Sequence, residues 1–286
     1  MNYSAIRFPK TDSTAFFRTL NQRVNGYFQQ NNLSKYGDWK LYVKSIVVFS
    51  LFLTPYFLIL AGGFNQWLML LLSVLIGVGM ACVGMCVMHD GNHGAYSRRQ
   101  WVNNLMGSSI YILAGNRYNW KAQHNVLHHT YTNIAEHDED VDAYGLLRLT
   151  KHEKWRRFHK YQHLFSVLLY GLMTLNWAIS KDYTQMRNYI RRGIQFDKKV
   201  NPAKEWTILI ITKVFYISTW IVLPILLLDI AWWKVLIGFV AMHYTAGIIL
   251  SVVFQLAHIV EDVETPLPDS DGNMQNTWAI HQLFTT

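Results

Sequence analysis

The chain has 286 residues, of which 51% are hydrophobic, and a formal net charge of +8. Its two cysteines, Cys82 and Cys86, lie in the same apolar run, so we exclude a disulfide-stabilised fold. The basic residues flank the apolar segments and do not alternate with aromatic residues along a stripe, so we expect a lipid bilayer and no nucleic acid as a partner.

Residues 1–44 form a polar N-terminal segment with an amphipathic helix predicted near its middle. Apolar side chains between Phe17 and Phe28 recur at intervals of three and four residues, which predicts a helix over residues 12–30. Such a helix can lie in the interface of a membrane, or it can pack against the core of a soluble domain. We expect the whole segment to lie on the cytoplasmic side of a membrane.

Four segments are apolar over the roughly twenty residues that a helix needs to cross a bilayer. These segments are Ser45–Phe64, Trp67–Met88, Trp206–Leu228 and Val235–Ala257. The first two are separated only by the region of Gly62 and Gly63, and the last two by a turn around Asp229. The sequence therefore predicts two helical hairpins that span a membrane.

Two shorter apolar stretches, Trp101–Leu113 and Leu164–Ile179, are too short to span and fit re-entrant or interfacial helices better. Two basic side chains, Lys213 and His243, lie within the predicted spans. We expect the Lys213 side chain to reach the lipid headgroups, because a lysine near the end of a span can extend to them. For His243, in the middle of a span, we expect a hydrogen bond between helices.

The distribution of basic residues predicts the orientation of the spans. Four spans place residues 1–44, residues 89–205 and the tail after Ala257 on one side of the membrane. Seven of the 26 lysines and arginines fall in the first of these segments and seventeen in the second. Because basic residues concentrate in cytoplasmic loops, we expect that side to be the cytoplasm.

Two histidine clusters adjoin the predicted spans on the cytoplasmic side. Histidines four residues apart share one face of a helix, which pairs His89 with His93 and His124 with His128. His129 points roughly a quarter-turn away and can reach a second metal. Imidazole is a ligand for iron, copper, zinc and nickel, and five convergent imidazoles indicate a two-metal site. The alternative is that these histidines are structural and bond to carbonyl groups or waters.

The sequence also limits the kind of metal site. No Glu-x-x-His motif of soluble di-iron bundles occurs, and no His-Glu-x-x-His motif of zinc proteases. What remains is a histidine-rich, carboxylate-poor site at a membrane face. Asp90, next to His89, can orient an imidazole by accepting its second N–H, or it can serve as a helix cap.

With these features the chain resembles the membrane-bound fatty acid desaturases over residues 40–286. MHDGNHGAYS, around His89 and His93, resembles the first histidine box of that family, and QHNVLHHTYTN resembles the second. The acidic run from Asp138 to Asp142 and the sequence QLAH ending at His258 are similar to bacterial acyl-CoA desaturases of the linoleoyl-CoA or front-end type.

The resemblance implies an all-α integral membrane fold in a desaturase domain of residues 45–286. Four transmembrane helices would form two hairpins, and a cytoplasmic helical cap would carry a histidine-rich metal site. In a bacterium the protein would lie in the inner membrane.

The resemblance further implies a non-haem centre of two iron ions that uses dioxygen to introduce a double bond into a fatty acyl chain. The substrate would be an acyl-CoA or an acyl-lipid, and the electrons would come from a ferredoxin or a small b-type cytochrome. The iron ligands that the resemblance implies are His89, His93, His124, His128, His129 and His258.

The family has a third histidine box some tens of residues beyond a segment like the one from His281 to Thr286, where this chain stops. We therefore expect a fragment of a longer protein, or alternatively a degenerate member. A fused haem domain would carry a His-Pro-Gly-Gly motif, which is absent, so we expect a separate electron donor. Two other functions remain open: a di-iron fatty acid hydroxylase of the same superfamily, and a non-enzymatic membrane haem protein.

Overall fold

The computed structural model describes residues 6–10, 15–141, 143, 145–194 and 200–286. Within these ranges the chain forms helices and loops, with an isolated bridge between Arg7 and Asn273. The chain divides into two compact units. The first, which we call the membrane-spanning unit, consists of Tyr36–Ala122 and Leu164–Val253, and the other consists of Met1–Lys35, Gln123–His163 and Phe254–Thr286.

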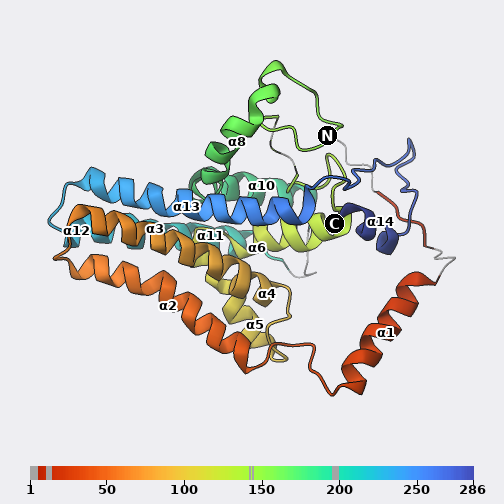
Figure 1. The fold of residues 1–286 in the computed structure, drawn as a ribbon, viewed down its shortest axis with the longest axis horizontal. Coiled ribbons are helices and arrows are strands. Elements are labelled where there is room, and N and C mark those ends of the chain that lie inside the picture. The colour runs from red at the N-terminus through yellow and green to blue at the C-terminus, as the bar shows by residue number, and fades with distance from the viewer. Residues whose placement is uncertain (1–5, 11–14, 142, 144, 195–199) are drawn as a thin grey trace. The chain divides into compact units, whose positions relative to one another are not determined.

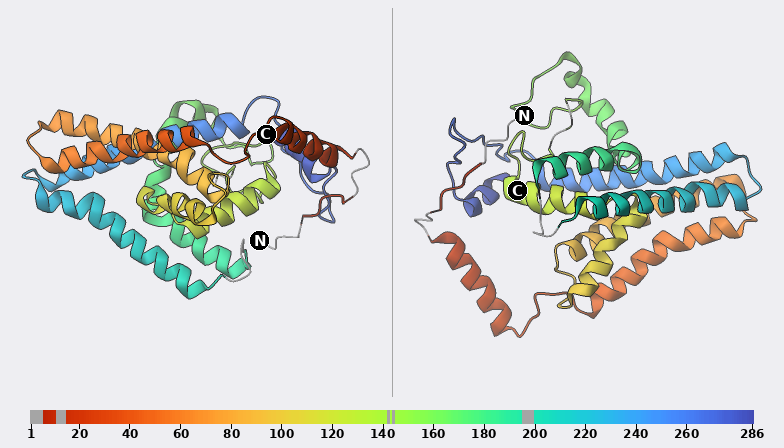
Figure 2. Two further views of the ribbon diagram at one scale, coloured as in Figure 1. Left: turned by 90° about the horizontal axis from the view of Figure 1, so that it is seen from below. Right: turned by 180° about the vertical axis from the view of Figure 1, so that it is seen from behind.

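Four long helical segments dominate the first unit. They extend in broadly the same direction in Figure 1, and the left view of Figure 2 shows the cyan segment diverging from the other three. All are long and apolar enough to cross a membrane, and the shortest, with 23 residues, extends about 34 Å. They are α2 (Trp39–Ala61), α3 (Gln66–Val83) continued by η1 (Gly84–Met88) and α4 (His89–Asn92), α11 (Pro202–Ile217) continued by η6 (Ser218–Val222) and α12 (Leu223–Leu227), and α13 (Trp232–His258). The prediction of an all-α fold with four helices able to span a membrane is confirmed for the described residues.

The turn of the first hairpin follows from its sequence. Gly62 and Gly63 have φ angles of 73° and 79°, a left-handed conformation that glycine adopts readily and other residues rarely do. The Asn65 side chain then caps α3 by accepting hydrogen bonds from the backbone N–H groups of Trp67 and Leu68. The chain therefore reverses direction within four residues.

Lys213 and His243, the basic residues within the predicted spans, both point into the protein. The prediction that Lys213 reaches the headgroups is wrong: this residue is only 5% exposed, and its Nζ lies 2.8 Å from Oδ2 of Asp182. The prediction for His243 is confirmed. Its Nε2 lies 2.8 Å from the Tyr216 hydroxyl and its Nδ1 lies 3.0 Å from Thr174 Oγ1, so it links three helical segments.

Shorter helices connect the two hairpins. They are α5 (Gln100–Gly107), η2 (Ser108–Leu113), α6 (Arg117–Trp120), α8 (Gln162–Gly171), α9 (Met173–Asn176), η5 (Trp177–Lys181) and α10 (Asp182–Arg192). As predicted, α5 and η2 are together too short to span a membrane. The helices over Arg157–Gly171 and Met173–Arg192 are bent by 48° at Leu172, so this stretch is either a broken span or a re-entrant loop.

The other unit contains the N-terminal helix, the second histidine cluster and the C-terminal residues. Its helices are α1 (Phe16–Gln30), η3 (Lys121–His128), α7 (His129–Tyr131), η4 (Arg157–Tyr161) and α14 (Trp278–Thr285). The helix predicted over residues 12–30 is confirmed from Phe16 onward, and residues 12–14 lie outside the described residues. None of the residues of α1 is buried, which argues against a core-packing helix.

Candidate metal centre

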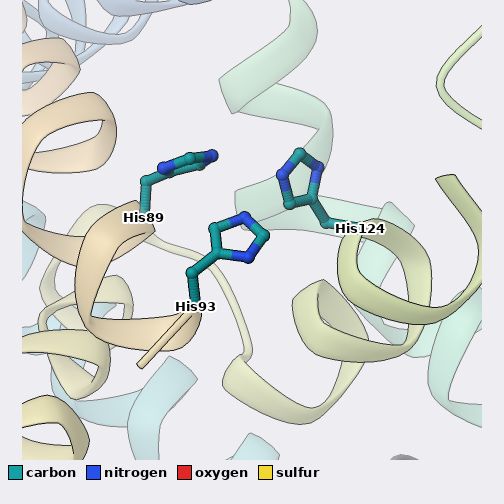
Figure 3. A group of neighbouring side chains, drawn as sticks. All are labelled: His89, His93 and His124. Carbon is teal, nitrogen blue, oxygen red and sulfur yellow. The ribbon is translucent and has the colours of Figure 1, made fainter. Parts of the chain in front are cut away.

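The first histidine cluster follows a local change in helix type. The α3 helix passes through the π-helical turn η1 directly before His89, and π-helical turns occur frequently at functional sites. His89 and His93 lie one turn apart, with ring centroids 4.4 Å from each other, and both project from the same helix (Figure 3). Asp90 Oδ1 lies 3.3 Å from His89 Nδ1, as expected for a carboxylate that orients the ring.

The helix that carries the first cluster packs against α5. Gly91 lies so close to the α5 backbone that a Cβ atom at this position would be 2.5 Å from the Gly107 nitrogen. The buried Asn92 side chain donates to the Gly107 carbonyl at 3.1 Å and accepts from Arg117 Nε at 2.7 Å. These contacts fix the direction in which His89 and His93 project.

Trp120 packs against the first cluster. Its ring meets His89 and His93 nearly edge to face, at centroid distances of 5.8 and 5.7 Å. Trp120 is the last residue of α6, which continues without a break into η3 and therefore into the second cluster. One continuous helix thus links a ring that contacts the first cluster to His124, four residues further on.

In the second cluster, His124 and His128 lie on the π-helical segment η3, and His129 is the first residue of α7. The ring centroids of His124 and His128 are 5.2 Å apart, and those of His124 and His129 are 4.7 Å apart. His124, which Figure 3 also labels, has its Nδ1 3.7 Å from Oδ2 of Asp140. One possible ligand atom from each of His124, His128 and Asp140 lies within 4.8 Å of the others, so these residues can hold a metal ion.

His128 is the most constrained of the predicted ligands. It is 1% exposed, and its Nδ1 lies 2.9 Å from Oδ2 of the buried Asp138. Burial lowers the pKa of the imidazole, but the hydrogen bond to Asp138 and the charges of Asp138 and Asp140 outweigh this effect and raise the pKa above its ordinary value. A carboxylate at Nδ1 favours the tautomer in which Nε2 is free to bind a metal.

His258, at the end of α13, meets His128. The two Nε2 atoms are 3.3 Å apart, and among the described residues the buried Nδ1 of His258 has no hydrogen-bond partner. Two imidazole nitrogens that face each other across this distance suit a shared metal ion, since zinc, for example, binds each at about 2.0–2.1 Å. The structure therefore places His258 beside His128 of the second cluster.

Asn133 connects the second cluster to the C-terminal helix α14. It has a φ of 57°, and its backbone N–H donates to Asp138 Oδ2 at 3.0 Å. Its side-chain nitrogen donates to the carbonyls of His258 and Thr285, both at 2.8 Å. One buried residue thus holds both the carboxylate that orients His128, through its backbone N–H, and the backbone of His258, through its side chain.

The prediction of a carboxylate-poor site needs correction. Asp138 and Asp140 both contact histidines of the second cluster, and neither role was assigned from the sequence. The sequence feature that could have indicated these roles is the acidic run that begins ten residues after His128, because a ligating histidine commonly donates its second N–H to a carboxylate. The connecting loop also brings Asn133 into the same network, which residue spacing does not predict.

The arrangement offers a donor set suited to a transition metal. It combines imidazoles whose tautomers are fixed by carboxylates with a buried imidazole nitrogen that lacks a partner. Such donors bind iron, zinc and copper, and the residues present therefore fit the metal ions expected from the sequence.

Comparison with known proteins assigns the chain to a family. The family model described as fatty acid desaturase matches residues 65–286. An sn-1 linoleoyl-lipid 6-desaturase from Arthrospira platensis is 33% identical over 99% of this chain and 75% of its own length. A protein of the same description from Synechocystis sp. is 29% identical over 99% of this chain and 78% of its own length.

A more distant relative is an acyl-lipid (8-3)-desaturase from Physcomitrium patens, 26% identical over 99% of this chain and 59% of its own length. No solved structure matches the chain. The family match, together with four helices able to span a bilayer, identifies an integral membrane protein of lipid metabolism. The chain belongs to the fatty acid desaturase family.

Proposed function

We propose that this protein is a di-iron, dioxygen-dependent desaturase that inserts a double bond into an acyl chain carried by a membrane lipid. The observation that carries the proposal is the second histidine cluster. There Asp138 holds His128 at Nδ1, and the Nε2 atoms of His128 and His258 face each other. Family membership makes desaturation the reaction to expect of such a site.

The proposed iron ligands are those expected from the sequence: His89, His93, His124, His128, His129 and His258. Two iron ions would supply the oxidising power from dioxygen that an unactivated C–H bond requires. The protein's part is to fix the imidazoles by hydrogen bonds. Asp90, Asp138 and Asp140 are the carboxylates that contact the proposed ligands.

We favour a lipid-linked acyl chain over an acyl-CoA as the substrate. The relatives with the highest identities quoted above are described as linoleoyl-lipid and acyl-lipid desaturases. The name linoleoyl further supports a substrate that is already unsaturated. A lipid substrate reaches the protein through the bilayer, which suits a chain with four membrane-spanning helices.

The site is proposed to face the cytoplasm of a bacterial cell, where a separate ferredoxin or b-type cytochrome would donate electrons. All but two of the 26 lysines and arginines fall on the side of the membrane that four spans assign to the histidines. The charged helix α10 supports four spans instead of five, because Arg187, Arg191 and Arg192 would be costly inside a bilayer.

Cysteine labelling tests this topology. With Cys82 and Cys86 replaced by alanine, single cysteines at the exposed positions Lys151 and Glu261 are expected to react with a membrane-impermeant maleimide from the same, cytoplasmic side. A cysteine at Asp229, in the turn of the second hairpin, should react only from the opposite side. Labelling of positions 151 and 261 from different sides would show that the bent helix pair crosses the membrane.

Lipid analysis tests the activity. The natural protein is produced in aerobic, iron-replete cells with a ferredoxin and its reductase, and the cells are supplied with linoleate. We expect a fatty acid with one additional double bond, which appears in intact lipids before it appears in acyl-CoA. Earlier appearance in acyl-CoA would reverse the substrate assignment, hydroxylated chains would identify a hydroxylase, and an unchanged profile would contradict desaturation.

A further inference from the structure

A buried ion pair lies within the membrane-spanning unit and is formed by residues outside the two histidine clusters. Lys213 on α11 and Asp182 at the start of α10 are 5% and 2% exposed, and their charged atoms are 2.8 Å apart. Ionisable residues inside membrane segments are rare, and they usually serve a function. A well-packed apolar pair is commonly as stable as a buried ion pair, so fold stability alone gives no reason for this one.

Lys213 has two backbone partners in addition to its ion pair with Asp182. Its Nζ donates to the carbonyls of Ala114 at 2.5 Å and Trp177 at 2.6 Å. Ala114 has a φ of 69° and ends η2, immediately before the turn that leads into α6. Lys213 therefore holds the backbone at the entrance of the helix that leads to the second histidine cluster.

Asp182 continues the network into that helix. The side-chain nitrogen of Asn119 donates both to the Asp182 carbonyl, at 2.7 Å, and to its Oδ1, at 3.1 Å. Asn119 is 1% exposed and lies in α6, whose next residue, Trp120, contacts the rings of His89 and His93. Two covalently adjacent residues thus connect the buried ion pair to the first histidine cluster.

We propose that Lys213, Asp182 and Asn119 are positioning residues that hold α6 in place beside the first histidine cluster. By holding α6 they fix the ring of Trp120 against His89 and His93. This inference rests on the proposed function, because it assigns the network to the metal site.

Two variants and a control test the proposal in detergent-solubilised protein. Asn119→Leu removes the link and leaves the ion pair in place, and the double variant Lys213→Met with Asp182→Leu replaces the ion pair by apolar side chains. Lys234→Met is the control, because Lys234 lies at the start of another span and donates to Gln66, outside this network. Each protein is titrated with Co²⁺, and the visible absorption spectrum of the bound ion reports its ligand geometry.

We expect both network variants to bind Co²⁺ about tenfold more weakly than wild type, with a changed spectrum, and to keep a wild-type thermal midpoint within a few degrees. The control should match wild type. Unchanged affinity and spectrum in Asn119→Leu would overturn the inference, even if the double variant fails to fold. A wild-type protein that binds no metal would instead contradict the proposed function, so the two failures are distinguishable.

Discussion

Substitution of His128 by glutamine is expected to abolish desaturation, with product formation at least about 100-fold below wild type. His128 is buried, bonds Asp138 through Nδ1 and faces His258 through Nε2, so glutamine cannot replace both contacts in the same geometry. Loss of the hydrogen-bond partner of a ligand typically costs 10- to 100-fold, and loss of the ligand itself should cost more. The measurement is the amount of newly unsaturated fatty acid per amount of membrane-inserted protein.

The matched control is His163→Gln, the same substitution at an exposed histidine of the same unit. His163 has no proposed role at the metal centre, so this variant should keep wild-type activity. Equal activity of His128→Gln and wild type would remove His128 from the ligand set. Equal loss in both variants would show that the effect is not specific to the metal centre.

Replacement of Asp138 by asparagine is expected to weaken metal binding by about 10- to 100-fold while the protein still folds. The carboxylate accepts hydrogen bonds from His128 Nδ1 and from the backbone N–H groups of Asn133 and Asp140. The amide can still accept from one side, but its NH₂ group would face a donor on the other. His128 would then lose its fixed tautomer and orientation.

Equilibrium dialysis followed by metal analysis measures this effect. Glu136→Gln is the control, since it makes the same chemical change at an exposed position of the same loop. Wild-type affinity in Asp138→Asn would show that the carboxylate does not support a ligand. A comparable loss in Glu136→Gln would point to a general effect of charge near the site.

Local patterns predicted the parts of the structure that depend on neighbouring residues. The apolar runs predicted four spans, and α2 and α13 differ from the predicted segments by only a few residues at their ends. The spacing of His89 and His93 predicted a shared helix face because four residues complete about one helical turn. These features follow from periodicity within a single segment.

Long-range partners were not predictable in the same way. The prediction for Lys213 failed because its ion-pair partner, Asp182, lies in another helix, and this carboxylate and the two carbonyl acceptors are brought together only by folding. The contact between His128 and His258 joins residues 130 positions apart, and only the family resemblance had indicated it. Asp138 reaches His128 through a loop in which Asn133 adopts a positive φ, and spacing alone does not specify such a loop.

The central claim is a non-haem centre of two iron ions held by histidines, and the most direct test is the iron content and Mössbauer spectrum of the purified natural protein. We predict two iron ions per chain in a nitrogen- and oxygen-rich environment, no haem Soret band, and a clear loss of iron in His128→Gln. Stoichiometric haem, tightly bound zinc without iron, or full iron loading in His128→Gln would contradict this account.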